Sequence, residues 1–194
     1  MNQVSSAAKA VANYTAAAFG VEKPPIFHLW DDDHKSDIYV LEASDCPQKG
    51  VISYATIGLS GYPLIRNGEE FNARVEFLGA CGSIFPGFNK ILATLSFCVI
   101  NSKWFCAPGV IFPGVMDMYD ASTTMSDIYF ANPFLWDDRF KSVEIGEKTT
   151  AWLLAVPISK KETEYAKRYG SEKLEELFSE KDIDIFNLNR ASVV

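Results

Sequence analysis

Ser60 lies in the stretch of this sequence that comes nearest to a nucleophile motif, Gly58-Leu59-Ser60-Gly61-Tyr62. The G-x-S-x-G elbow of serine hydrolases turns sharply from a strand into a helix, and it needs a small residue where this chain has Tyr62. Pro63 follows and opposes an immediate helix. Both histidines of the chain lie upstream of the serine, whereas that hydrolase fold supplies its histidine downstream. We therefore predict that the chain is not a serine hydrolase.

The two histidines lie close in sequence to aspartates that could bind a metal ion. His28, Asp31, Asp33 and His34 carry imidazole and carboxylate groups, which suit zinc or manganese. Their spacing matches no familiar metal site, and one short segment offers no distant further ligand, so a solvated acidic turn is the favoured interpretation. The phosphate-binding pattern G-x-x-x-x-G-K and the dinucleotide-binding pattern G-x-G-x-x-G do not occur. We expect neither a metal nor a cofactor.

Carboxylate pairs and cysteines complete the groups that could carry chemistry. Asp137 and Asp138 could act as general acid and base, but adjacent carboxylates on a loop usually remain solvated. The four cysteines have irregular spacing without a C-x-x-C pair: Cys46, Cys81, Cys98 and Cys106. Buried free thiols would indicate a reducing compartment, and the N-terminus lacks the basic region and apolar core of a secretion signal. We expect a cytoplasmic protein that is not an enzyme.

Length and charge restrict the class of partner. The 194 residues suit a single domain, 1–194, that buries about 70% of the surface its unfolded chain would expose. Hydrophobic residues at 48% and charged residues at 22% are typical of soluble globular proteins. The net charge of −7 repels phosphate backbones and anionic membranes and favours encounter with basic proteins, so we expect neither a nucleic-acid nor a membrane partner. Acidic charge that only maintains solubility is the simpler alternative.

Hydrophobic periodicity and turn residues predict strands that alternate with helices. The expected strands are 26–30, 37–42, 51–57, 74–81, 110–112, 127–131 and 151–157. Helices are expected over 4–19 and 88–100, the second with Asn89 as its cap. Ser159 and Glu162 form a capping box at the start of a third helix, and Ser171 is expected to cap a fourth. The run 151–157 is apolar throughout, which favours a central strand over an edge strand.

Several short motifs resemble those of one known family. Thr56-Ile57-Gly58-Leu59-Ser60-Gly61-Tyr62-Pro63 followed by Arg74-Val75-Glu76-Phe77 resembles the signature of the suppressor-of-fused (SUFU-like) domain family. The segments 131–136, 152–159 and 184–192 resemble later parts of its bacterial members. The resemblance covers nearly the whole chain, and the order and spacing of the pieces carry it. With the predicted elements, it implies an α/β (α+β) fold: a single-domain sandwich with a central mixed β-sheet flanked by helices.

The resemblance also implies a function. Bacterial SUFU-like proteins of this size resemble immunity proteins (antitoxins) that neutralise a cognate polymorphic toxin, often a nuclease of an LXG-type toxin system. Animal relatives sequester a transcription factor. The family contributes no catalytic residues, so pairing of Arg74 with Glu76 or with another carboxylate would be structural. We expect a stoichiometric binder of a basic toxin, and a scaffold that holds another basic protein is the alternative.

Acidic and aromatic residues at three places are the expected partner-binding residues. An interface combines large apolar anchors with a polar rim, and acidic groups provide a field that complements a basic partner. The candidates are Asp31, Asp32, Asp33, Trp136, Asp137, Asp138, Glu172 and Glu176. The alternative for Phe134 and Trp136 is that their rings fill the core.

Overall fold

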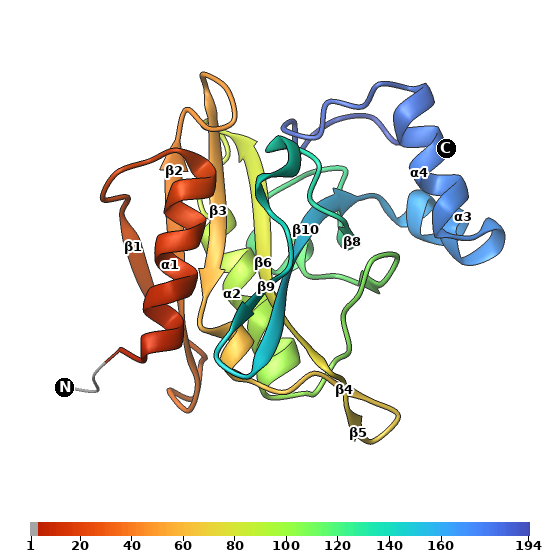
Figure 1. Ribbon diagram of the computed structural model, residues 1–194. Coiled ribbons are helices and arrows are strands. Elements are labelled where there is room, and N and C mark those ends of the chain that lie inside the picture. Colours follow the sequence, from red (N-terminus) through yellow and green to blue (C-terminus); the bar gives the residue numbers. More distant parts are fainter. Residues whose placement is uncertain (1–3) are drawn as a thin grey trace.

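A mixed β-sheet separates two layers of helices in the computed structural model, which describes residues 4–194 (Figure 1). Helix α1 lies in front of the sheet in this view and α2 lies behind it. The helices are α1 (Ser6–Phe19), α2 (Phe88–Ile100), α3 (Lys160–Tyr169) and α4 (Ser171–Glu180), with the 3-10 turns η1 (Leu59–Gly61), η2 (Met116–Tyr119) and η3 (Asp137–Arg139). The strands are β1 (Ile26–Trp30), β2 (Asp37–Ser44), β3 (Val51–Ile57), β4 (Ile65–Arg66), β5 (Glu69–Glu70), β6 (Ala73–Gly82), β7 (Ile111–Phe112), β8 (Asp127–Ala131), β9 (Val143–Ile145) and β10 (Lys148–Ile158).

The strand order of the main sheet is β1-β2-β3-β6-β10-β8-β7, and β9 pairs with β10. The pair β6–β10 is parallel, and the other pairs are antiparallel. β10 lies between β6 and β8, which agrees with the continuous apolar run that predicted a central strand. The expected fold class, a central mixed sheet flanked by helices, is therefore confirmed.

Strict alternation along the strands builds a core on each face of the sheet. Val75 and Phe77 of β6 point to the face that α2 covers, where they pack with Ile91 and Leu95. Leu78 of β6 points to the opposite face, whose core α1, α3 and α4 complete. The residues that these three helices contribute there include Val11, Phe19, Ala166 and Leu174. Both faces of β6 and β10 are thus buried along most of their length.

Local capping signals explain where most helices begin and end. Ser5 caps α1 by accepting a hydrogen bond from the Ala8 N–H, and Gly20 ends this helix in the left-handed conformation. The predicted capping box of α3 is present in full. Two predicted caps are wrong: Gly87, not Asn89, is the N-cap of α2, and Ser171 is the first residue of α4 rather than its cap.

Three short strands were not predicted. β4 and β5 are each two residues long and pair in a hairpin. β9 is a strand of three residues that pairs with β10. Runs of two or three residues are too short to show a period of two, which is why the sequence pattern missed them. Within residues 4–194, no helix is long and apolar enough to cross a membrane.

Candidate partner-binding surface

The motif that carries the family resemblance builds a loop around a buried carboxylate. Glu76 has no solvent exposure, and its two oxygens accept hydrogen bonds from five donors. These donors are the hydroxyls of Thr56 (2.6 Å) and Ser60 (2.7 Å) and the backbone N–H groups of Gly58 (2.9 Å), Leu59 (3.3 Å) and Ser60 (3.0 Å). Gly58 has a φ of 107°, a left-handed conformation that lets successive N–H groups converge on one carboxylate. Burial raises the pKa of Glu76, and the donated hydrogen bonds oppose that rise.

These contacts give the motif a structural role. The Ser60 hydroxyl donates its hydrogen to Glu76 and therefore lacks the histidine partner that a serine nucleophile needs. The expected pairing of Arg74 with Glu76 is wrong, but the second alternative holds, because Arg74 donates to Glu70 at 2.7 Å. Thr56 also accepts a hydrogen bond from the Phe77 N–H at 2.7 Å, so the motif ties β3 to β6.

The histidines and cysteines have structural surroundings as well. The Nε2 atom of His28 lies 2.6 Å from the Oδ2 atom of Asp37, and the imidazole ring stacks on the ring of Tyr39. No group of three or more His, Cys, Asp or Glu side chains in residues 4–194 is arranged to hold a metal ion. All four cysteines are free, and burial raises the pKa of Cys81 and of Cys106 to about 12. A thiol with such a pKa stays protonated and unreactive near neutral pH.

The acidic turn between β1 and β2 is tied to the end of α2. Asp31 accepts hydrogen bonds from the Lys35 N–H (2.7 Å) and from the Asn101 amide (2.9 Å). Asn101 in turn accepts from the Ser36 hydroxyl at 2.7 Å. Desolvation is the largest single influence and raises the pKa of Asp31, but the hydrogen bonds together outweigh it and lower the pKa below its usual value. Asp32 and Asp33 project from the same turn and remain exposed.

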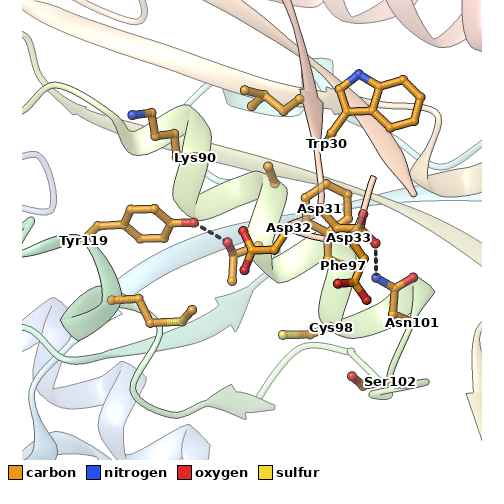
Figure 2. A pocket seen from close by; sticks show the side chains of 14 residues that line it. Trp30, Asp31, Asp32, Asp33, Lys90, Phe97, Cys98, Asn101, Ser102 and Tyr119 are labelled. Atoms are coloured by element: carbon orange, nitrogen blue, oxygen red, sulfur yellow. Dashed lines mark hydrogen bonds between the residues drawn. The ribbon is translucent and has the colours of Figure 1, made fainter. Parts of the chain in front are cut away.

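This turn forms one wall of a pocket of about 590 Å³, shown in Figure 2. The outer face of α2 and the turn η2 form the other walls, and the lining carries three aspartates against one basic residue, Lys90. Met118 of η2 exposes 66% of its surface, and Tyr119 is tied to α2 by a hydrogen bond with Thr94. An acidic wall beside exposed apolar groups is the mixture that binds a basic protein segment.

The second predicted group requires a correction. Trp136 is only 1% exposed, packs against Phe19 and Phe140, and donates its indole N–H to Ser53 at 3.0 Å. Its ring fills the core on the α1 face and is not accessible to a partner. The predicted partner-binding role of Trp136 is therefore wrong, and the alternative prediction, that this ring fills the core, is confirmed. Phe134 is the exposed aromatic residue of this segment, at 60%.

The remaining candidates lie apart from the pocket. Asp137 and Asp138 are exposed on η3, which the Trp136 ring anchors on the α1 face. Glu172 and Glu176 are exposed on α4, whose Glu175 accepts a hydrogen bond from Tyr129 of β8. Because β1 and β8 lie toward opposite edges of the sheet, the acidic residues form three separate clusters rather than one surface.

Sequence reasoning missed the residues of η2 and the exposed side chains of β1. Met118 lies in an irregular segment without periodicity, so no pattern distinguishes an exposed methionine from a buried one there. Trp30 belongs to a correctly predicted strand, but its 47% exposure follows from the position of that strand at the edge of the sheet. The sequence pattern predicts which residues form strands, but it does not predict the order of the strands in the sheet.

The chain belongs to the suppressor of fused protein (SUFU) family, whose model matches residues 32–191. It is similar to Immunity protein YqcF of Bacillus subtilis (strain 168), with 41% identity over 186 residues that cover 96% of each chain. The family resemblance expected from the motifs is thus confirmed.

Solved structures show the same fold. A putative SUFU homologue from Neisseria gonorrhoeae FA 1090 has a TM-score of 0.72 at 16% identity and 96% coverage of both chains. A chain of the Sufu–Fu complex has a TM-score of 0.68 at 13% identity, over 96% of this chain and 92% of that chain. Drosophila Suppressor of Fused has a TM-score of 0.66 at 15% identity, and the match spans 95% of this chain and 50% of the Drosophila chain.

Proposed function

We propose that the protein is an immunity protein that binds a cognate protein toxin and neutralises it by stoichiometric masking. The observation that carries this proposal is the 41% identity to Immunity protein YqcF, which extends over 96% of both chains. The proposed site of action is the cytoplasm of the cell that also encodes the toxin. The proposed toxin is basic, and a nuclease of an LXG-type system would fit this description.

Charge supports a basic partner. The net charge is −7, and the pocket beside the β1–β2 turn carries three aspartates against one lysine. A nuclease binds nucleic acid through a basic cleft, so an acidic protein surface competes directly for that cleft. Electrostatic steering of this kind raises association rates by about 10 to 10³-fold and weakens as salt increases.

Masking requires one bound immunity protein per toxin and no turnover. The Ser60 hydroxyl, which is half-buried and donates to Glu76, and the high pKa of Cys81 and Cys106 support binding rather than covalent chemistry. Titration of the purified toxin with this protein should therefore abolish toxicity at one molar equivalent. Full protection at a small fraction of an equivalent would indicate an enzyme instead.

The direct test is co-expression with the product of the neighbouring gene in a host that lacks both. Expression of the neighbour alone should arrest growth, and co-expression should restore growth and yield a complex on size-exclusion chromatography. An empty vector is the control. Persistent arrest without a complex would refute the proposal. Binding to a basic protein that is not toxic would support the alternative of a sequestering scaffold.

A further inference from the structure

Strand β1 leaves one side of its backbone open at the edge of the sheet. β2 pairs with β1 along its whole length, from Ile26 opposite Leu41 to Trp30 opposite Asp37. Within residues 4–194 no strand pairs with its other side, and Figure 1 shows β1 as the outermost strand, beside α1. An open edge presents a row of backbone N–H and C=O groups to which another extended segment can bind.

Two hydrogen bonds identify the backbone groups that face outward. The Glu42 N–H donates to the Pro25 carbonyl at 3.0 Å, and the Asp31 N–H donates to the Ser36 carbonyl at 2.9 Å. Hydrogen-bonded positions alternate along an antiparallel strand, so the odd-numbered residues of β1 bond to β2. The even-numbered residues turn their N–H and C=O groups away from β2, and these residues are Ile26, His28 and Trp30.

The side chains of β1 are unusual for an unpaired edge. Ile26 is 48% exposed, Phe27 39% and Trp30 47%. Exposed edge strands are normally protected by charged residues, by proline or by a covering element. β1 contains no Lys, Arg, Asp, Glu or Pro. α1 packs on β2 and β3, and α2 contacts one face of β1, so neither helix covers the open backbone edge. Apolar side chains on both faces of an open edge favour the addition of a strand.

Charge around β1 selects the kind of segment that would bind. Residues 22–42 contain six acidic and two basic residues, which gives this hairpin a net charge of −4 out of the chain's −7. The acidic turn at Asp31, Asp32 and Asp33 follows directly after β1 and forms the pocket wall of Figure 2. A second copy of this chain would bring two such hairpins together and repel, whereas a basic segment would be attracted.

We propose that an extended basic segment of the toxin adds as a strand to the open edge of β1. Its backbone pairs with Ile26, His28 and Trp30, and its basic side chains reach the acidic turn and the pocket. This inference rests on the proposed immunity function and states how the toxin is held. It makes main-chain pairing the source of affinity, and the acidic turn the source of orientation and of fast association.

Two substitutions at one position test this pairing. His28→Pro removes an outward N–H and blocks strand addition, but it leaves the β1–β2 hydrogen bonds intact, because proline is tolerated on an edge strand where the N–H faces away. His28→Ala keeps the N–H and loses the same ring contacts with Asp37 and Tyr39. We expect His28→Pro to weaken toxin binding by about tenfold or more relative to His28→Ala, at similar melting temperatures. Equal dissociation constants would overturn the inference.

Hydrogen exchange on the unmodified protein provides a second test, which holds even if His28→Pro does not fold. Binding of the toxin should slow exchange of the amides of Ile26, His28 and Trp30 by about tenfold or more, because each would become a ladder hydrogen bond. Unchanged exchange at these amides in a formed complex would overturn the inference.

The outcomes separate this inference from the proposed function. If the unmodified protein neither binds nor neutralises the toxin, the proposed function fails. If it does both, and His28→Pro binds as well as His28→Ala, only the strand addition fails. A dimer of the purified protein that His28→Pro converts to a monomer would show that a second copy occupies the edge, which also overturns the inference.

Discussion

Arg190 forms a bidentate ion pair with Glu162 inside the protein. Its two terminal nitrogens donate to the two carboxylate oxygens at 2.7 Å and 2.9 Å, and the side chains are 7% and 0% exposed. Glu162 also accepts from the Ser159 N–H (2.8 Å) and the Val193 N–H (3.0 Å). The Glu162 carboxylate therefore completes the capping box of α3 and also binds the C-terminal segment through Arg190 and Val193.

Arg190→Ala should therefore destabilise the protein strongly. The substitution leaves the Glu162 charge buried without its partner, and breaking a buried pair in this way costs about 3–5 kcal/mol in the free energy of unfolding. Lys167→Ala is the matched control, because Lys167 pairs with Glu164 on the exposed side of the same helix, where a pair contributes about 0.5 kcal/mol. Urea denaturation of both variants measures the difference. A loss below about 1 kcal/mol for Arg190→Ala would contradict the structural role of the pair.

Glu76→Gln should destabilise the fold without changing the size of the side chain. The amide nitrogen of glutamine cannot accept hydrogen bonds, so part of the donor set from β3 and η1 would lose its acceptor. Buried donors left unsatisfied cost about 1–3 kcal/mol each, and we expect a total loss of about 3 kcal/mol or more. Glu69→Gln, on the exposed β4–β5 hairpin, should change stability by less than about 0.5 kcal/mol. Similar urea midpoints for the two variants would argue against the Glu76 cluster as a structural centre.

Gly79→Ala tests the close approach of β6 and α2. A Cβ atom at Gly79 would lie 2.3 Å from the Phe88 ring, which is only 1% exposed, so the ring or the backbone would have to shift. Overpacking of this kind costs about 1–3 kcal/mol. Gly61→Ala is the control, because a methyl group at Gly61 would meet no other atom within 4 Å and the φ of Gly61 is not positive. Thermal melts should show a clear decrease for Gly79→Ala alone, and equal melting temperatures would count against this packing.

Cys81 and Cys106 should resist alkylation in the native protein. Only the thiolate reacts, and a pKa of about 12 for Cys81 and Cys106 leaves about one molecule in 10⁴ ionised at pH 8. The rate should rise about tenfold per pH unit while the fold persists, because the raised pKa lies above this range. Mass spectrometry after iodoacetamide treatment should find both thiols unmodified in native protein and modified in urea. Fast labelling of either one in the native state would contradict the burial.

Much of the fold could be predicted from the sequence because its long elements have strong periodicity. The strands 51–57 and 127–131 and the helix 88–100 were predicted with the bounds that the structure has. The position of Trp136 could not be predicted, because an aromatic residue beside carboxylates suits an interface and a core equally well. The separation of the acidic clusters could not be predicted from the sequence either, because it depends on which strands are neighbours in the sheet. The Glu76 cluster was anticipated only as a family motif, and its donors come from residues 16 to 20 positions away.

Neutralising the acidic turn should slow association with the toxin if that turn faces it. Asp32→Asn with Asp33→Asn removes two negative charges beside the pocket, and we expect the association rate to fall about threefold to tenfold at low salt. Asp137→Asn with Asp138→Asn removes the same charge from η3 on the opposite face and should have a smaller effect. Near 1 M salt, where the Debye length is about 3 Å, the difference between the two variants should disappear. Stopped-flow or surface plasmon measurements at both salt concentrations check this. A larger effect from the η3 pair would place the toxin on the α1 face instead, and would also contradict docking at the edge of β1.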